Sequence, residues 1–158
     1  MPKIDMTQVP VKSGTIYPPE FAPQVAGRSS LRLGDVGGLT QFGVNIVILA
    51  PGAKSSMRHW HLNEDEFVMM TMGECVLVQD AGETVMRLGD CAAFPAGVPD
   101  GHCLINRTET EARFVVVGSK APREVATYCD VDLTVEQSGG VNTFRRKDGR
   151  PYISNGQG

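Results

Sequence analysis

The chain lacks any close pair of cysteines. Its four cysteines, Cys75, Cys91, Cys103 and Cys129, are widely spaced, and no C-x-x-C motif occurs. This spacing argues against a zinc knuckle and against a redox-active dithiol. We therefore expect free, mostly buried thiols in a reducing compartment.

Long apolar runs are also missing. No window approaches the roughly 20 apolar residues that a membrane helix requires. The first residues, MPKIDMTQVP, contain no apolar stretch of the kind found in a signal peptide. These absences predict a cytoplasmic protein without a membrane partner.

A basic surface is the third missing feature. The formal net charge is -3, and the only basic run is Arg145-Arg146-Lys147, followed by Arg150. Binding to DNA, RNA or an anionic bilayer requires a basic stripe or patch that displaces counterions. We therefore expect no nucleic-acid partner.

The amino-acid composition of the chain changes near residue 38. Residues 1–38 are rich in Pro, Gly and polar residues. Because proline removes a backbone donor, this segment is predicted to be an extended N-terminal arm outside the central ladders. It is expected to pack on its own domain or on a second subunit. Residues 39–153 have the length of one β-barrel domain with a C-terminal strand extension.

From residue 40 onward, short runs of Val, Ile, Phe and Met alternate with Gly and Pro turns at intervals of about 8–12 residues. A sustained helical period of 3.6 is absent from this region. The pattern predicts an all-β fold, either a double-sheet jelly roll or a small β-barrel. The predicted strands are residues 42–48, 55–61, 66–72, 74–79, 83–88, 91–94, 102–106, 112–118 and 141–146.

The chain has only three histidines, His59, His61 and His102. The i, i+2 spacing of the first two places both imidazoles on one face of a strand. Glu66 opens the next apolar run, and His102 follows a later Gly/Pro turn. Three imidazoles and one carboxylate suit Fe, Mn, Co, Ni or Zn and leave positions open for substrate. His59, His61, Glu66 and His102 are therefore predicted to bind one divalent metal ion.

These residues resemble the two motifs of the cupin family. The first motif, G-x5-H-x-H-x3-4-E-x6-G, is matched by Gly52, His59, His61, Glu66 and Gly73, with Gly52 one residue farther away than usual. The second motif, G-x5-P-x-G-x2-H-x3-N, is matched by Gly89, Pro95, Gly97, His102 and Asn106. Asp100 stands where this motif has its histidine, and His102 is taken as the ligand because its spacing to Asn106 is intact.

The resemblance covers residues 40–118. It implies a double-stranded β-helix, which is a jelly-roll β-barrel, together with a metal site and a homodimer. The second motif also resembles a branch of small bacterial cupins loosely described as sugar-phosphate isomerase-like.

Because a fold does not dictate a reaction, three functions are compared. The leading prediction is a metal-dependent isomerase or lyase acting on a small carbonyl, carboxylate or sugar-like molecule. The metal would act as a Lewis acid, and Asp100 or Glu64 would be the catalytic group that moves a proton. The alternatives are an Fe(II)-dependent dioxygenase and a non-catalytic sensor of a small ligand or metal.

Overall fold

The computed structural model describes residues 3–152, which are almost entirely strands and connecting turns. The short helices are η1 (Met6–Gln8), η2 (Ala22–Val25) and α1 (Leu33–Val36). The strands are β1 (Val11–Ser13), β2 (Arg28–Leu31), β3 (Phe42–Leu49), β4 (His59–His61), β5 (Glu66–Met72), β6 (Glu74–Gln79), β7 (Gly82–Arg87), β8 (Cys91–Phe94), β9 (Cys103–Ile105), β10 (Ala112–Ser119), β11 (Arg123–Tyr128), β12 (Thr134–Ser138) and β13 (Val141–Arg145). No helix in the described range is long and apolar enough to cross a membrane.

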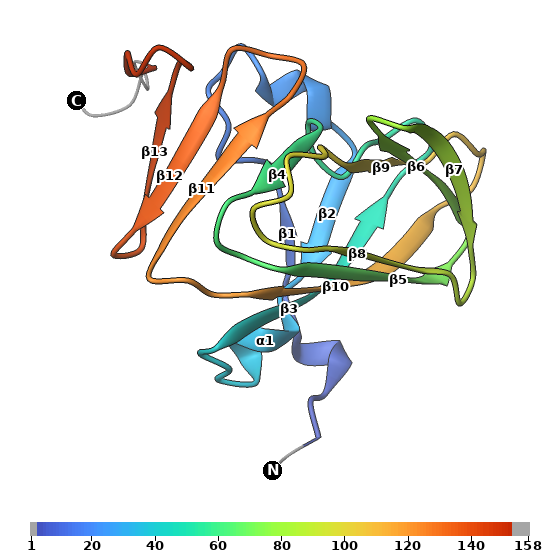
Figure 1. The fold of residues 1–158 in the computed structure, drawn as a ribbon. Coiled ribbons are helices and arrows are strands. Elements are labelled where there is room, and N and C mark those ends of the chain that lie inside the picture. The colour runs from blue at the N-terminus through green and yellow to red at the C-terminus, as the bar shows by residue number, and fades with distance from the viewer. Residues whose placement is uncertain (1–2, 153–158) are drawn as a thin grey trace.

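The strands form two antiparallel layers (Figure 1). One layer is a six-stranded sheet in the order β1-β2-β3-β10-β5-β8. The other consists of a four-stranded sheet, β13-β12-β11-β4, and a three-stranded sheet, β7-β6-β9. Isolated bridges between Lys54 and Ile105 and between His59 and His102 connect these two smaller sheets. The arrangement confirms the predicted all-β jelly-roll fold.

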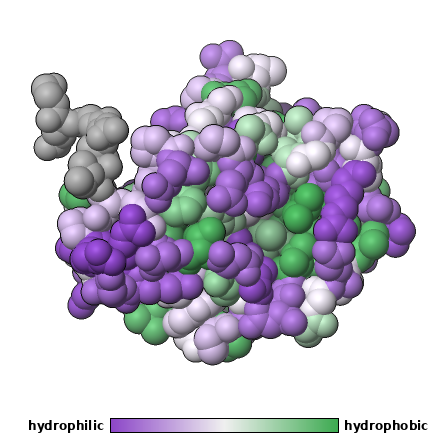
Figure 2. All heavy atoms as spheres, turned by 90° about the horizontal axis from the view of Figure 1, so that it is seen from above, coloured by the Kyte–Doolittle hydropathy of each residue, from purple (hydrophilic) through white to green (hydrophobic). Residues whose placement is uncertain are grey.

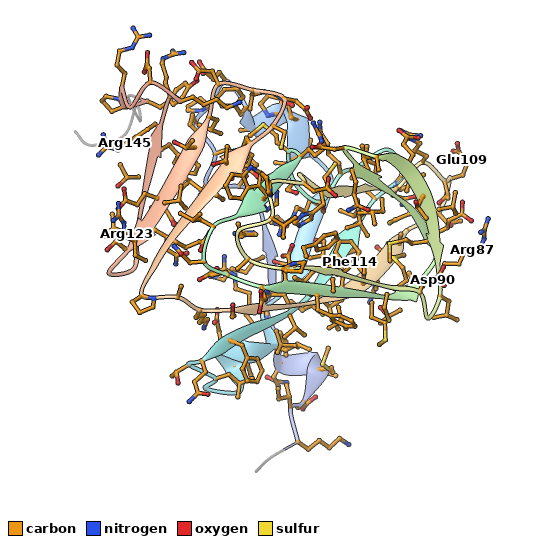
Figure 3. The ribbon with its side chains drawn as sticks, viewed as in Figure 1. Arg87, Asp90, Glu109, Phe114, Arg123 and Arg145 are labelled. Carbon is orange, nitrogen blue, oxygen red and sulfur yellow. The ribbon has the colours of Figure 1, made fainter. Side chains whose placement is uncertain are left out.

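The main hydrophobic core lies between the six-stranded and three-stranded sheets. Because side chains alternate along a strand, Val47 of β3 and Val68 of β5 point into this core. Phe114 of β10 is only 1% exposed, and Figure 3 shows it inside the barrel, with Arg87 and Arg123 at the periphery. The surface seen from above is mainly hydrophilic, with apolar patches between the polar side chains (Figure 2).

A second, smaller cluster lies against the four-stranded sheet. It consists of the buried residues Met57, Tyr128 and Leu133, with Tyr17, Phe21, Val131, Val135, Phe144 and Tyr152 packed around them. The N-terminal and C-terminal parts of the chain therefore share one apolar cluster, which fixes the N-terminal segment to the barrel.

The N-terminal segment forms part of the six-stranded sheet. Residues 28–31 of β2 pair with β3, and β1 pairs with β2 as the edge strand. The expectation that residues 1–38 stay outside the ladders is therefore wrong for these strands. The physical reason is that β1 and β2 contain no proline, because the prolines of this segment lie in its connections.

Candidate metal centre

The backbone brings the predicted ligands together from three parts of the chain. His59 and His61 are the ends of β4, and Glu66 is the first residue of β5. His102 lies directly opposite His59, because the backbone N–H of each donates to the carbonyl oxygen of the other, at 3.2 and 2.9 Å. The antiparallel bridge between these two residues thus positions a histidine that is remote in sequence.

The ring nitrogens and the carboxylate form a compact cluster. The Nε2 atoms of His59 and His61 are 3.1 Å apart. One ligand atom each from His59, His61 and Glu66 lies within 4.8 Å of the others. The Nε2 atom of His102 lies 2.7 Å from Oε2 of Glu66. Since metal–nitrogen bonds of about 2.1 Å place neighbouring ligand atoms about 3 Å apart, the spacing of His59, His61 and Glu66 suits a shared cation, and His102 adjoins this group through Glu66.

Hydrogen bonding and burial favour the protonation states that metals bind. The Nδ1 atom of His59 lies 2.9 Å from the carbonyl oxygen of Met57, which can only accept. Nδ1 therefore carries the proton, and the Nε2 lone pair faces the cluster. Burial, followed by the charges of His61 and His102, lowers the pKa of His59 to about 3. This imidazole is therefore neutral at neutral pH.

Glu66 supplies the negative charge of the cluster. Burial alone would raise the pKa of Glu66, but the hydrogen bond and charge of His102, together with His59 and His61, outweigh it and lower this pKa to about 2. The carboxylate is therefore ionised at neutral pH, as metal coordination requires.

Glu124 on β11 supports the cluster, and sequence reasoning missed it. Its side chain is buried and accepts hydrogen bonds from the backbone N–H groups of Leu62 and Asn63, each at 2.8 Å. Its Oε1 atom lies 3.5 Å from Nδ1 of His61. Glu124 thus fixes the loop between His61 and Glu66, and its carboxylate lies beside the Nδ1 atom of the His61 imidazole. No local sequence pattern indicates this role, because Glu124 lies 62 positions away from Leu62 in the chain.

The two predicted catalytic acids do not line the main cavity. Asp100 accepts hydrogen bonds from the Gln79 side chain at 3.0 Å and from the backbone N–H of Asp80 at 2.9 Å, beside a smaller pocket. Glu64 accepts from the backbone N–H of Ala121 at 2.8 Å, and burial raises its pKa. Both carboxylates therefore stabilise loops around the cluster, and their predicted catalytic role stays a prediction.

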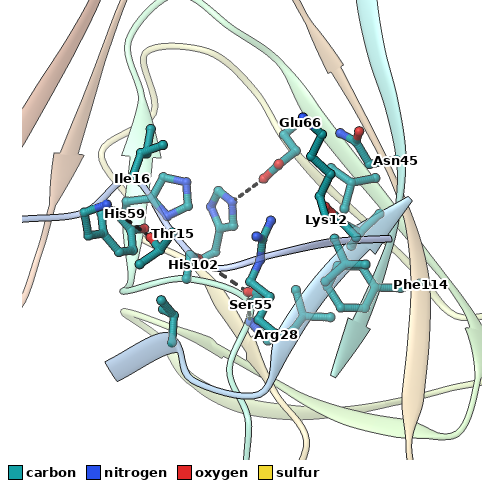
Figure 4. A pocket seen from close by; sticks show the side chains of 18 of the residues that line it. Lys12, Thr15, Ile16, Arg28, Asn45, Ser55, His59, Glu66, His102 and Phe114 are labelled. Carbon is teal, nitrogen blue, oxygen red and sulfur yellow. Dashed lines mark hydrogen bonds and ion pairs between the residues drawn. The ribbon is translucent and has the colours of Figure 1, made fainter. Parts of the chain in front are cut away.

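A cavity of about 470 Å³ adjoins the cluster. His59, His61, Glu66 and His102 line it together with residues 12–17, which comprise the end of the edge strand β1 and the segment after it. Arg28 of β2 projects into this cavity toward Glu66 and His102 (Figure 4). Sequence reasoning did not single out Arg28 or the residues 12–17.

Comparison with known proteins agrees with this architecture. The cupin domain family matches residues 45–118. A sugar phosphate isomerase of the cupin superfamily from Silicibacter pomeroyi is 53% identical, with 98% of each chain covered and a TM-score of 0.94.

More distant structures share the fold. A protein from Acidithiobacillus ferrooxidans is 22% identical, with 84% of each chain covered and a TM-score of 0.75. The polyketide cyclase RemF from Streptomyces resistomycificus is 19% identical, with 75% of this chain and 79% of that chain covered and a TM-score of 0.63. The search of curated proteins gave no match. From the family match and the Silicibacter pomeroyi structure, we conclude that the chain belongs to the cupin family.

Proposed function

We propose that this cupin is a metal-dependent enzyme that isomerises or cleaves a small carbonyl, carboxylate or sugar-like molecule. The observation that carries the proposal is the convergence of His59, His61, Glu66 and His102 at a cavity of about 470 Å³. Pockets of this size, with a few convergent polar groups, are typical of small-molecule sites. The similar protein from Silicibacter pomeroyi, described as a sugar phosphate isomerase, supports the same substrate class.

The four clustered residues would hold one divalent ion, which is Zn, Mn, Fe, Ni or Co by the chemistry of the donor set. When bound, such an ion supplies Lewis-acid polarisation of a substrate oxygen. The chain itself contributes the orientation of the imidazoles. Met57 fixes the tautomer of His59, and Glu124 holds the loop that follows His61.

Proton transfer requires further groups at the cavity wall. Burial raises the pKa of Tyr17, so its hydroxyl stays protonated at neutral pH and can donate to a substrate oxygen. Lys12 lines the same cavity, and its side-chain nitrogen can donate a hydrogen bond to a substrate oxygen. Asp100 and Glu64 remain the second assignment, because they lie near His61 but outside the main cavity.

Elemental analysis tests the metal site directly. We expect the purified protein to contain about one divalent ion per chain, and His59→Ala and His102→Ala to lose it. Asp100→Asn is the matched control, since its carboxylate binds Gln79 and the Asp80 backbone, and it should retain the ion. A wild-type protein that binds none of the five metals after reconstitution would rule out the proposed function.

Exchange in D₂O tests the reaction class. Aldose phosphates, ketose phosphates and hydroxy acids are incubated with the metal-loaded protein in D₂O. Proton NMR follows the loss of the signal from the proton on the carbon next to the carbonyl or carboxylate, as deuterium replaces it. If the protein is an isomerase or lyase, wild type should exchange this proton in one of these classes of compound or convert the compound, and the His102→Ala variant should do neither. Oxygen consumption with Fe(II) and without such exchange would instead support a dioxygenase. Light scattering of the same preparation tests the predicted homodimer.

A further inference from the structure

One wall of the cavity is built by a part of the chain that the cupin family match does not include. Residues 12–17, Arg28, Ser30 and Arg32 line the cavity, whereas the family match spans residues 45–118. The metal ligands lie inside the match, and this wall lies outside it. The features that select the substrate of this particular protein are therefore expected in residues 12–32.

Arg28 is the unusual member of this wall. Its Nε atom is buried and has no hydrogen-bond partner. Within residues 3–152, the guanidinium forms neither an ion pair nor a side-chain hydrogen bond, whereas Arg58, Arg107 and Arg113 each pair with a carboxylate. A guanidinium carries five donors, and removing it from water without a partner is costly. An unpaired arginine in a cavity is therefore suited to a ligand that brings its own acceptor.

The balance of charge in the cavity favours an anion as this ligand. Three of the described residues that line it are cations, Lys12, Arg28 and Arg32, and one is a carboxylate, Glu66; Arg32 also pairs at 3.8 Å with Asp35, which does not line the cavity. Glu66 already contacts His102, and it would be neutralised by a divalent ion. Burial lowers the pKa of Arg28, although Tyr17 and Glu66 oppose this effect, and a guanidinium stays charged at neutral pH. With a metal bound, the cavity is therefore positively charged.

We propose that Arg28 is the anchor for an anionic substrate, with its guanidinium pairing with a carboxylate or phosphate group of that substrate. The planar fork of arginine can bind two oxygens of either anion at once. Figure 4 shows Arg28 pointing from β2 toward Glu66 and His102. An anion held there places a neighbouring hydroxyl or carbonyl oxygen of the same molecule at the metal cluster. The assignment of a substrate rests on the proposed function, whereas the anion site itself can be tested without metal.

Calorimetric titration tests the anchor with three probes. Glycolate supplies a carboxylate, inorganic phosphate supplies a phosphate, and glycolamide is the uncharged counterpart of glycolate. Each probe is titrated into chelator-treated and metal-reconstituted protein. We expect wild type to bind at least one of the two anions, and the tighter of them identifies the anionic group of the substrate.

Two substitutions and one control isolate the guanidinium. Arg28→Met should weaken binding of the preferred anion at least tenfold in both preparations, and Arg28→Lys should bind with intermediate affinity, because it keeps the charge and loses the fork. Arg113→Met is the control, since Arg113 pairs with Glu111 and does not line the cavity. Its anion affinity should equal that of wild type, and glycolamide should not distinguish any of the variants.

Thermal unfolding separates an anchor from a structural arginine. Without anion, Arg28→Met should melt at or above the temperature of wild type, because it removes a half-buried cation whose Nε atom has no partner. Adding the preferred anion should raise the melting temperature of wild type more than that of Arg28→Met. Unchanged anion affinity in Arg28→Met would overturn the anchor, as would failure of wild type to bind either anion. The metal analysis and the anion titration test different claims. Failure to bind any metal would refute the proposed function, whereas the titration of metal-free protein would still decide the role of Arg28.

Discussion

Replacement of Glu124 by glutamine tests how the metal site is supported. The Glu124 side chain is only 3% exposed and accepts two backbone N–H bonds at 2.8 Å, from Leu62 and Asn63. Hydrogen bonds to a charged group are each worth about 1.5–3 kcal/mol. In Glu124→Gln, the amide oxygen can accept one neutral bond, and the amide NH₂ faces the other N–H. We therefore expect the free energy of unfolding to fall by about 2–4 kcal/mol.

The same substitution should weaken metal binding about 10–100-fold. The reason is that the carboxylate no longer holds the loop between His61 and Glu66 or faces Nδ1 of His61. Urea denaturation in the presence of a chelator measures the stability effect without metal, and competition with a chromogenic chelator measures the affinity. Glu136→Gln is the matched control. Its ion pair with Arg123 lies at the surface and should change stability by less than about 0.5 kcal/mol. A Glu124→Gln protein with wild-type stability and wild-type metal affinity would refute this reasoning.

Three further predictions address other parts of the molecule. Asn106→Ala should lower the free energy of unfolding by about 3–5 kcal/mol in chemical denaturation. The reason is that its buried amide donates to the carbonyl oxygens of Leu49, at 2.9 Å, and Thr110, at 2.7 Å. A chelator should lower the melting temperature of wild type and leave that of His102→Ala unchanged, since only wild type gains stability from bound metal. In alkylation followed by peptide mass spectrometry, exposed Cys91 should react first, and Cys75 should react only after unfolding, because its thiol is buried and burial raises its pKa to about 11.

Local sequence patterns predicted most of the barrel. The predicted strands 66–72, 74–79 and 91–94 coincide with β5, β6 and β8, because alternating apolar residues and intervening turns mark their ends. Gly73 illustrates such a turn. It has a φ of +70°, and a Cβ atom there would lie 2.8 Å from the carbonyl oxygen of Glu111. Glycine is therefore required between β5 and β6 for both conformation and space.

Other strands were not recognised from sequence. β11 and β12 were missed because their residues are mixed in polarity, and their stability comes from pairing with β4 and with each other. The N-terminal strands β1 and β2 were missed for a related reason. The short polar sequence of β2 becomes a strand because the edge of β3 offers it partners, and β1 in turn pairs with β2.

The sequence by itself determined the chemistry of the candidate centre. The period of two along a strand places His59 and His61 on one face, and three imidazoles with a carboxylate define the class of metal that can bind. Only the tertiary structure decided which remote residues surround that centre. Glu124 and Arg28 belong to strands whose inward faces depend on their register with β4 and β3. Register is set by pairing between segments far apart in the chain, so no local pattern can show that these two charged side chains face inward.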